Sequence, residues 1–525
     1  MKTLFYGGNI ITMTEPLYAE AVLIEDGIIT AVGGVMELRA LGADKYVDLD
    51  GAVMLPGFID THSHITEYAM ATLEADLDGI ADFETLRDTI RVYIQENNIP
   101  RGEWVVAHNY EHNLFPGSKK LTIEELDSIC PEHLLLIKHV GCHMGLVNSN
   151  VFEKFGINSE TPDPKCGCYV RENGRLTGCL EETACTEMRM RIPKPTLERI
   201  CDAHKRVQHL YASYGITTAQ DGYLGGDMIE VYRRLLDEAE LKLDLFAYVH
   251  IPHYERLKAA FDVAVGDSAK VRIGGIKQYL DGSISARTAW MREPYLNSGD
   301  YCGYPQRTDE EVIDTMRYAA KHGLQIIYHS IGDAANEQFV RCLKLAENEC
   351  PELRALRPTL IHAVFMDKPM LEKAAELGAV ISFLEGEAYY WGDAYIRTLG
   401  MERTKTVCPA RTALECGVHF NFHTDAPVLS PDMLETVWCA ATRMTRDGVH
   451  LDGEEISVLE ALHAITLGAA YQYFEESKKG TVEAGKVADL VILDKDPLKA
   501  NLNEIKTINV LQTYKNGICI YKKGG

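Results

Sequence analysis

Two histidines one residue apart are the first feature of the chain that points to chemistry. His62 and His64 close the apolar stretch Met54-Leu-Pro-Gly-Phe-Ile-Asp-Thr-His-Ser-His64. Side chains alternate between the two faces of a β-strand, so both imidazoles are expected on one side. Neutral imidazole is a common ligand of zinc and similar ions. The pair therefore predicts half of a metal site, and the remaining ligands must come from elsewhere in the chain.

Further residues able to bind a metal stand where later apolar stretches end. They are Lys277, His329, His362 and Asp425. Each has an ordinary structural explanation. A strand-end histidine is usually a satisfied polar residue, a buried lysine needs a carboxylate partner or a lowered pKa, and an aspartate after a strand is often a helix N-cap. Because all six candidates fall at strand ends, we favour one functional metal site over six separate structural roles.

The last of these stretches also indicates which side chains face inward. Its polar members are His419, Asn421, His423 and Asp425. They alternate with Val418, Phe420 and Phe422. In a strand of a closed sheet, alternate residues face the interior. We therefore expect the polar set to point inward and the apolar set to pack on outer helices.

Alternating strand and helix signals must position these residues. The short apolar stretches predicted as buried strands are 215–220, 271–277, 324–329, 358–362, 379–383 and 418–425. Amphipathic helical stretches such as 309–322 and 368–377 lie between them. Repeated βα units in this number predict an α/β fold with a parallel (β/α)8 TIM-like barrel. In such barrels the active site lies at the C-terminal ends of the strands, where the candidate ligands stand.

The two ends of the chain have a different texture, with short strands joined by tight turns. A few strands at either end cannot each form a stable sheet, so we expect one small β-sandwich built from both termini. The predicted domains are 1–54 plus 475–525 for this small β domain, 55–65 plus 190–474 for the catalytic barrel, and 66–189 for an inserted subdomain.

Composition sets the class of protein. The 525 residues are 46% hydrophobic and 25% charged, which is typical of a globular protein, and the net charge of -24 disfavours a nucleic-acid partner. The 14 cysteines contain no Cys-x-x-Cys, which disfavours a zinc finger and indicates a reducing compartment.

No signal peptide and no apolar run near the ~20 residues of a membrane span are found. We expect a cytoplasmic protein with a small-molecule substrate and no membrane partner, and a homodimer is one option for its assembly.

Longer motifs around the candidate ligands resemble the amidohydrolase superfamily. More narrowly, the chain is similar to amidohydrolase family 3, the group that includes N-substituted formamide deformylases. The similarity covers nearly the whole chain and is specific for the family, although not for a substrate. The segments that carry it are Leu55–His64, Lys277–Ser283, His329–Ala334, Thr424–Pro427 and Gly480–Leu490.

The resemblance implies one or two divalent metal ions, with zinc expected. His62 and His64 would bind the more buried ion together with Asp425, and His329 and His362 would bind the second. Lys277 resembles the lysine that reacts with carbon dioxide in binuclear members. The resulting N6-carboxylated lysine would bridge the ions. The alternative is an unmodified Lys277 beside a single ion.

Several residues depart from the family pattern close to the expected pocket. Ile361 replaces a common glutamate, Ser382-Phe383-Leu384 replaces a Gln-Pro pattern, His423-Thr424 replaces Gly-Ser, and Gly141-Cys142-His143 replaces Asp-Gly-His. None removes a predicted ligand. His143 and His423 are candidates for stabilising the oxyanion or binding the substrate, and structural hydrogen bonding is the alternative for both.

The resemblance implies hydrolysis of a C–N bond, in an amide, N-acyl or N-formyl group, by metal-activated hydroxide. Asp425 would accept the proton of the attacking water and deliver it to the departing nitrogen. A deaminase of a heterocyclic or amidine substrate is the first alternative, and Lys277 argues against it, because deaminases of the superfamily usually lack this lysine. A non-catalytic scaffold with the same fold is the second alternative, and isomerisation or lactone hydrolysis is a minor one. All six ligands are present, which disfavours the scaffold.

Overall fold

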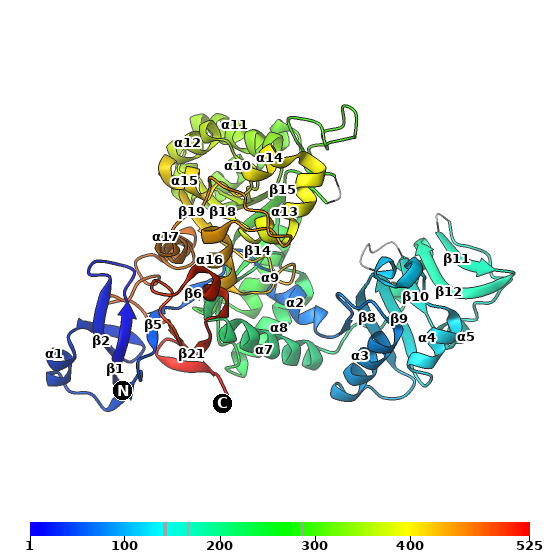
Figure 1. Ribbon diagram of the computed structural model, residues 1–525, viewed down its shortest axis with the longest axis horizontal. Coiled ribbons are helices and arrows are strands. Elements are labelled where there is room, and N and C mark those ends of the chain that lie inside the picture. The colour runs from blue at the N-terminus through cyan, green and yellow to red at the C-terminus, as the bar shows by residue number, and fades with distance from the viewer. Residues whose placement is uncertain (140–143, 166, 286, 525) are drawn as a thin grey trace. The chain divides into compact units, whose positions relative to one another are not determined.

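The computed structural model describes residues 1–139, 144–165, 167–285 and 287–524 (Figure 1). The chain divides into two compact units, and each is described by itself. One unit combines Met1–Glu67 with His204–Gly525, and the other is Tyr68–Ala203. The domain boundaries predicted from the sequence stay predictions. Among the described residues, no helix combines the length and apolar character needed to cross a membrane.

The first unit contains a curled sheet of eight parallel strands, so the fold is of the α/β class. Its strands pair in the order β19-β18-β17-β16-β15-β14-β13-β6, which is their order along the chain. Their bounds are Phe58–Ile59 (β6), Ile216–Asp221 (β13), Asp244–His250 (β14), Val271–Tyr279 (β15), Gln325–Ser330 (β16), Thr359–His362 (β17), Val380–Phe383 (β18) and His419–Phe422 (β19).

The segments after the first and last strands of this sheet are joined by main-chain hydrogen bonds. Asp425 N–H donates to the His62 carbonyl at 2.9 Å, and His64 N–H donates to the Ala426 carbonyl at 2.7 Å. The curl therefore brings the carboxyl ends of β6 and β19 together, although the two strands belong to distant parts of the chain. Any side chains at these strand ends share one edge of the sheet.

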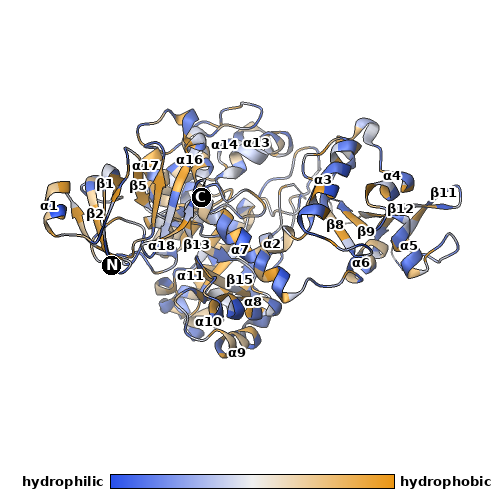
Figure 2. Ribbon diagram, turned by 90° about the horizontal axis from the view of Figure 1, so that it is seen from below, coloured by the Kyte–Doolittle hydropathy of each residue, from blue (hydrophilic) through white to orange (hydrophobic). Residues whose placement is uncertain are grey.

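Helices alternate with the strands and follow ordinary start and stop signals. In α10, Thr308 and Glu311 form a capping box at the N-terminus, and Gly323 ends the helix in the left-handed conformation. The main helices of this unit are α7 (Leu197–Ser213, which begins in the other unit), α8 (Gly226–Asp237), α9 (Tyr254–Ala264), α10 (Asp309–His322), α11 (Asp333–Glu349), α12 (Lys368–Glu376), α13 (Gly386–Leu399), α14 (Met401–Lys405), α15 (Ala410–Cys416), α16 (Met433–Thr442), α17 (Val458–Ala464) and α18 (Leu467–Gln472). Helices such as α9 carry both hydrophilic and hydrophobic stretches (Figure 2), as expected for helices that cover a sheet.

Strands such as β17 and β18 are buried on both faces. Every residue of β17 and β18 is buried, which explains why these strands appear in the sequence as continuous apolar runs. Inside the curl, Phe246 stacks on Tyr473 with ring centroids 3.9 Å apart. This pair belongs to an apolar cluster that also contains Ile59, Ile327 and Ile361. The cluster fills the interior below the strand ends that hold the polar residues.

Segments from both ends of the chain share a second sheet in this unit, in the order β22-β21-β20-β5-β1-β2-β3, with β4 beside β1. The strands are β1 (Lys2–Ile11), β2 (Tyr18–Glu25), β3 (Ile28–Gly33), β4 (Lys45–Asp48), β5 (Val53–Pro56), β20 (Leu490–Leu493), β21 (Val510–Lys515) and β22 (Ile518–Lys522). Strand β5 pairs with β20 and continues into β6. The terminal sheet therefore holds the segment that leads directly to His62. A sandwich architecture here stays a prediction.

The second unit has its own six-stranded sheet, in the order β11-β12-β10-β9-β8-β7. Strands β7, β8 and β9 are parallel, and β9 to β12 are antiparallel. A separate apolar core that includes Leu86, Val105, Leu126 and Leu135 supports this sheet. The elements are β7 (Ala75–Asp76), β8 (Trp104–Tyr110), β9 (Leu134–His139), β10 (Met144–Val147), β11 (Gly167–Glu172), β12 (Arg175–Glu182), α3 (Phe83–Glu96), α4 (Ile123–Ile129), α5 (Ser149–Phe155) and α6 (Thr183–Met190).

Candidate metal centre

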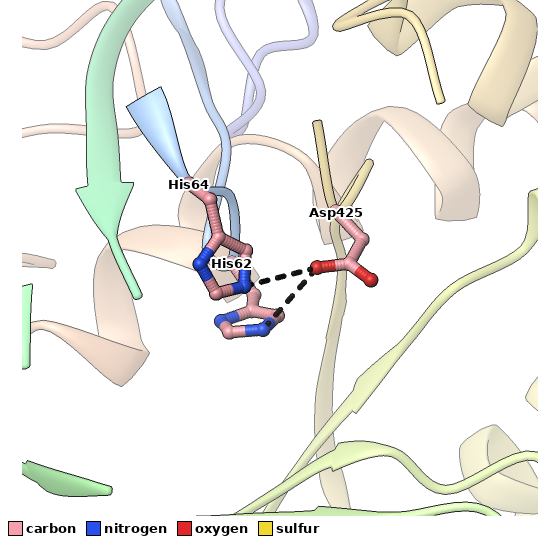
Figure 3. A group of neighbouring side chains, drawn as sticks. All are labelled: His62, His64 and Asp425. Carbon is pink, nitrogen blue, oxygen red and sulfur yellow. Dashed lines mark ion pairs between the residues drawn. The ribbon is translucent and has the colours of Figure 1, made fainter. Parts of the chain in front are cut away.

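His62, His64 and Asp425 meet at the joined ends of β6 and β19. Asp425 Oδ1 lies 3.4 Å from His62 Nε2 and 3.5 Å from His64 Nε2, and both dashed lines in Figure 3 end on this one oxygen. The ligand atoms of these three residues all lie within 4.8 Å of one another. Strand β6 ends at Ile59, so the histidine pair lies just beyond the strand rather than within it. The main-chain bonds to the Asp425 segment hold the pair in place.

The other three predicted ligands belong to the same cluster. Lys277 Nζ, on β15, lies 3.1 Å from His62 Nε2. The ring of His362, on β17, has its centroid 5.5 Å from that of His62 and 4.7 Å from that of His329, on β16. The structure therefore brings together all six residues that the sequence predicts as metal ligands. Their roles as ligands stay a prediction.

Gln220, which the sequence analysis assigned no role, orients the His62 ring. Its Nε2 donates to the Thr61 carbonyl at 2.7 Å, so its Oε1 faces His62 Nδ1 at 2.5 Å. Because an amide oxygen only accepts, His62 carries its proton on Nδ1, and the lone pair of Nε2 points toward Asp425 and Lys277. Partners of this kind fix the tautomer of metal-binding histidines. The only signal in the sequence is that Gln220 stands near the end of a predicted strand.

His329 is oriented in a similar way from the opposite nitrogen. Its Nε2 lies 3.1 Å from the Gly282 carbonyl, which only accepts, so Nδ1 keeps its lone pair. Asp281, beside this glycine, accepts hydrogen bonds from the main-chain N–H groups of Ile331 and Gly332. The loop after β15 and the loop after β16 are thereby tied together around the histidine.

His423 lies beside His362 with both ring nitrogens engaged. Its Nε2 is 3.1 Å from His362 Nδ1, and its Nδ1 is 2.8 Å from Ser382 Oγ. Ser382 and His423 both depart from the family pattern, and they contact each other. This geometry suits a residue that positions His362. A direct role of His423 in oxyanion stabilisation or substrate binding stays a prediction, and His143 lies outside the described residues.

The backbone at two of the predicted ligands is in the left-handed region. His362 has φ +72° and Asp425 has φ +55°. Non-glycine residues adopt this conformation rarely, at a cost of about 1–3 kcal/mol, and such residues cluster at functional sites. His419, in contrast, is exposed at the beginning of β19 and stacks on Tyr471. The prediction that it faces the interior is wrong, because the strand starts at that residue, four positions before His423.

Burial controls the protonation of the cluster. It lowers the pKa of His329 to about 4 and that of His423 to about 3, so both rings are neutral near pH 7. It also lowers the pKa of Lys277 to about 8, against the opposing effect of Asp425. Burial alone would raise the pKa of Asp425, but the nearby histidines hold it below its ordinary value. His329 and His423 are therefore neutral imidazoles, and Asp425 is a carboxylate.

This donor set fits a divalent metal ion. Neutral imidazole and carboxylate are the ligands that zinc takes in proteins, and ligand atoms around a four-coordinate zinc lie about 3.4 Å apart. Asp425 Oδ1 is buried and, among the described residues, has no hydrogen bond of good geometry, although two ring nitrogens lie within 3.5 Å of it. A buried carboxylate oxygen in this state is costly unless a cation satisfies it.

A family model described as "Amidohydrolase family" matches residues 45–521, which is most of the chain. The protein belongs to this amidohydrolase family. The match spans all six predicted ligands, so the family resemblance stated from the motifs is confirmed. Family and relatives together support a metal-dependent hydrolase.

Similar proteins are known over the full length of this amidohydrolase. The chain is 26% identical to a putative amidohydrolase, YtcJ, of Bacillus subtilis, with 100% of each chain covered. It is 27% identical to an N-substituted formamide deformylase of Arthrobacter pascens, with 97% of this chain and 96% of the relative covered. The crystal structure of an uncharacterized metal-dependent hydrolase from Pyrococcus furiosus has a TM-score of 0.77 at 24% identity, and covers 95% of this chain and 100% of its own. That likeness shows that this chain has the same fold as the Pyrococcus furiosus protein.

Proposed function

We propose that the protein hydrolyses the C–N bond of an amide, N-acyl or N-formyl group in a small molecule. The observation that carries the proposal is the convergence of Asp425 on His62 and His64. Lys277 Nζ lies 3.1 Å from His62 Nε2 in the same cluster. The similarity to an N-substituted formamide deformylase over nearly the full length supports this class of bond. The net charge of -24 supports a small molecule rather than a nucleic acid as the substrate.

The proposal includes the finer architecture. The curled sheet closes as a (β/α)8 barrel, supported by the hydrogen bonds between the ends of β6 and β19. Residues 66–189 are an inserted subdomain, and the terminal sheet is a small β-sandwich. The apolar cluster around Tyr473 fills the barrel interior, so the active site lies at the carboxyl ends of the barrel strands.

His62, His64 and Asp425 would hold one divalent ion, with zinc as the metal, and His329 and His362 would hold a second. A divalent ion in such a site lowers the pKa of bound water and polarises a carbonyl group. Gln220 and the Gly282 carbonyl fix the tautomers of His62 and His329 so that each presents a lone pair.

Lys277 would be carboxylated when two ions are bound. The neutral amine adds to carbon dioxide, a C–N bond forms, and one proton leaves to solvent, which gives a carbamate. Lys277 is 1% exposed and touches His62 Nε2, so an ammonium group there would face two cations. A carbamate reverses its charge. The check is a ¹³C resonance from protein prepared in ¹³C-bicarbonate, which should be absent in Lys277→Arg.

Asp425 would transfer the proton. Its low pKa keeps it ionised near pH 7, and its Oδ1 faces the centre of the cluster. It can accept the proton of the attacking water and release it to the departing nitrogen, which then leaves as a neutral amine. Without that proton the leaving group would be an amide anion, which is a very poor one.

The test is a substrate panel with metal-reconstituted protein. It contains N-formyl amines, N-acyl amines, acylated amino acids and cyclic amides, and amine, carboxylic acid and ammonia are measured separately. Amine released together with carboxylic acid supports the proposal. Ammonia as the sole nitrogen product would assign a deaminase instead. A protein that binds no metal and turns over nothing would be a scaffold.

A further inference from the structure

The unit Tyr68–Ala203 has a second group of metal-binding side chains, which the proposed function does not use. Glu111 and His112 directly follow β8, and His139 ends β9. The two strands are parallel, and Tyr110 pairs with His139 in the register. The carboxyl ends of parallel strands meet at one edge of a sheet, where ligand sites tend to form.

A bulge in β8 brings these neighbours in sequence to one point. The register shifts between Ala107 and Tyr110, and Asn109 has φ +62°. Bulges of this kind redirect side chains and are common next to binding sites. After the bulge the chain enters a short 3₁₀ turn at His112, so Glu111 and His112 both reach toward His139.

The three ligand atoms form a compact triangle. His112 Nδ1 lies 3.0 Å from His139 Nε2, and Glu111 Oε1 lies 3.5 Å from each of these nitrogens. Ligands held by one four-coordinate zinc with bonds of about 2.0–2.1 Å are separated by about 3.4 Å. The side chain of Glu111 is 28% exposed, that of His112 22% and that of His139 14%. The side chains of the triangle are therefore mostly buried but still partly accessible to solvent.

We propose that Glu111, His112 and His139 form a second metal site, which binds zinc or a similar divalent transition ion through two imidazoles and one carboxylate. Three protein ligands leave a fourth position for water or for an anionic ligand. The site shares no residue with the cluster around His62. Its existence does not depend on the proposed amide hydrolysis, so either can fail alone.

The experiment compares the number of metal equivalents bound by full-length proteins. Wild type and the double variant His112→Gln, His139→Asn are stripped with a chelator and dialysed against micromolar Zn²⁺, and bound zinc is measured by atomic emission. The double variant should bind one equivalent fewer than wild type. The matched control is His108→Gln, on the same strand but outside the triangle, which should bind as many equivalents as wild type.

A spectroscopic measurement separates the two sites. Wild type titrated with Co²⁺ should show one set of visible absorption bands that is lost in the double variant and kept in Asp425→Asn. Circular dichroism in chelator checks folding, and Glu111→Gln replaces the double variant if that protein is unfolded, with an expected loss of zinc affinity of more than about tenfold. Equal zinc equivalents and equal cobalt spectra in wild type and variants would overturn the proposal and leave an ion-paired cluster only.

Discussion

Two histidine clusters at the carboxyl ends of parallel strands differ in how firmly their side chains are held. The cluster around His62 draws its members from both ends of the curled sheet and from strands between, and His62 itself is fully buried. The cluster around Glu111 draws on two strands, and its side chains are 14–28% exposed. In the His62 cluster, hydrogen bonds with Gln220, Gly282 and Ser382 orient the rings of His62, His329 and His423, respectively.

The difference shows what burial adds to a set of suitable residues. Burial keeps the His329 and His423 rings neutral far below the ordinary pKa of histidine, and fixed partners select one tautomer. An open cluster such as the one around Glu111 has the ligand types and the spacing, but less to exclude competing water. We therefore expect the His62 cluster to bind metal more tightly than the Glu111 cluster.

The largest effect is expected from Asp425→Asn. The amide keeps the shape of the side chain but cannot accept the proton of water, so kcat with an amide substrate from the panel should fall by about 10³-fold. Much of the metal should remain bound. Asp314→Asn, on the exposed face of α10, is the control and should keep full activity. Near-normal turnover in Asp425→Asn would remove its proton-transfer role.

His204 separates the effect of burial from that of metal binding. This ring is fully buried in α7, outside both clusters, and its Nδ1 lies 3.2 Å from Gln208 Nε2. Burial lowers its pKa to about 4, against 6.5 in the unfolded chain. Between these values the unfolded chain binds the proton and the folded one does not, so stability present above pH 6.5 is lost as the pH falls. The loss is about 3 kcal/mol at pH 4.

Chemical denaturation of wild type and His204→Gln at pH 7, 5.5 and 4 measures this loss. The variant should lose about 3 kcal/mol less than wild type over that range. His322→Gln, an exposed ring at the end of α10, should follow wild type. Parallel curves for wild type and His204→Gln would show that burial alone does not depress a histidine pKa in this protein.

Gln220→Met tests the hydrogen bond that orients the His62 ring. The side chain keeps its length but loses the oxygen that accepts from His62 Nδ1, so the affinity of this cluster for zinc should fall by about 10- to 100-fold. Competition with a chromophoric chelator measures it. Gln220→Glu keeps an acceptor and should retain most of the affinity. If both variants bind zinc as wild type does, the orienting bond is not what distinguishes the two clusters.

The smallest effect concerns the unit that carries the Glu111 cluster. Thr122 Oγ1 accepts from Glu125 N–H, and Glu125 Oε2 accepts from Thr122 N–H, in a capping box at the start of α4. Thr122→Ala should destabilise this unit by about 1 kcal/mol. Hydrogen exchange over residues 123–129 should become faster, with unchanged exchange around β16 and β17.

Ser457→Ala is the matched control, because it removes the same kind of capping box from α17 in the other unit. Its effect should appear around residues 458–464 and leave α4 unchanged. If either variant alters hydrogen exchange equally in both units, the two units do not unfold independently. A difference between their clusters could then reflect the stability of the whole protein.

The sequence predicted which side chains gather at the strand ends, because each of the candidate ligands ends an apolar run. Lys277, His329 and His362 stand at or near the ends of β15, β16 and β17, and the predicted helices 309–322 and 368–377 correspond to α10 (Asp309–His322) and α12 (Lys368–Glu376). Both the buried strands and the helices that cover them bury apolar residues, so the spacing of apolar residues predicts both. The parallel order of the eight strands follows from the same alternation.

The orienting contacts could not be predicted, because they join residues with no local relation. Gln220 reaches His62 across 158 positions of sequence, and Ser382 reaches His423 across 41. Strand bounds failed at β6, because the buried polar residues Asp60 and Thr61 continue past Ile59, the last paired position. The Glu111 cluster was missed because Glu111 and His112 are adjacent, and the bulge in β8 and the 3₁₀ turn after it, which bring both side chains to His139, have no clear signal in the sequence.

The hydrogen bond between Asp60 and Thr424 joins residues 364 positions apart, in the same stretches as the histidine pair and its carboxylate. At about 5–20 residues per second, a ribosome releases the first stretch roughly 20 to 70 seconds before the second. The contiguous unit Tyr68–Ala203 emerges in between and can fold during that time. A nascent chain that stops short of Thr424 therefore presents His62 and His64 without Asp425, and this cluster is completed only when most of the chain has been synthesised.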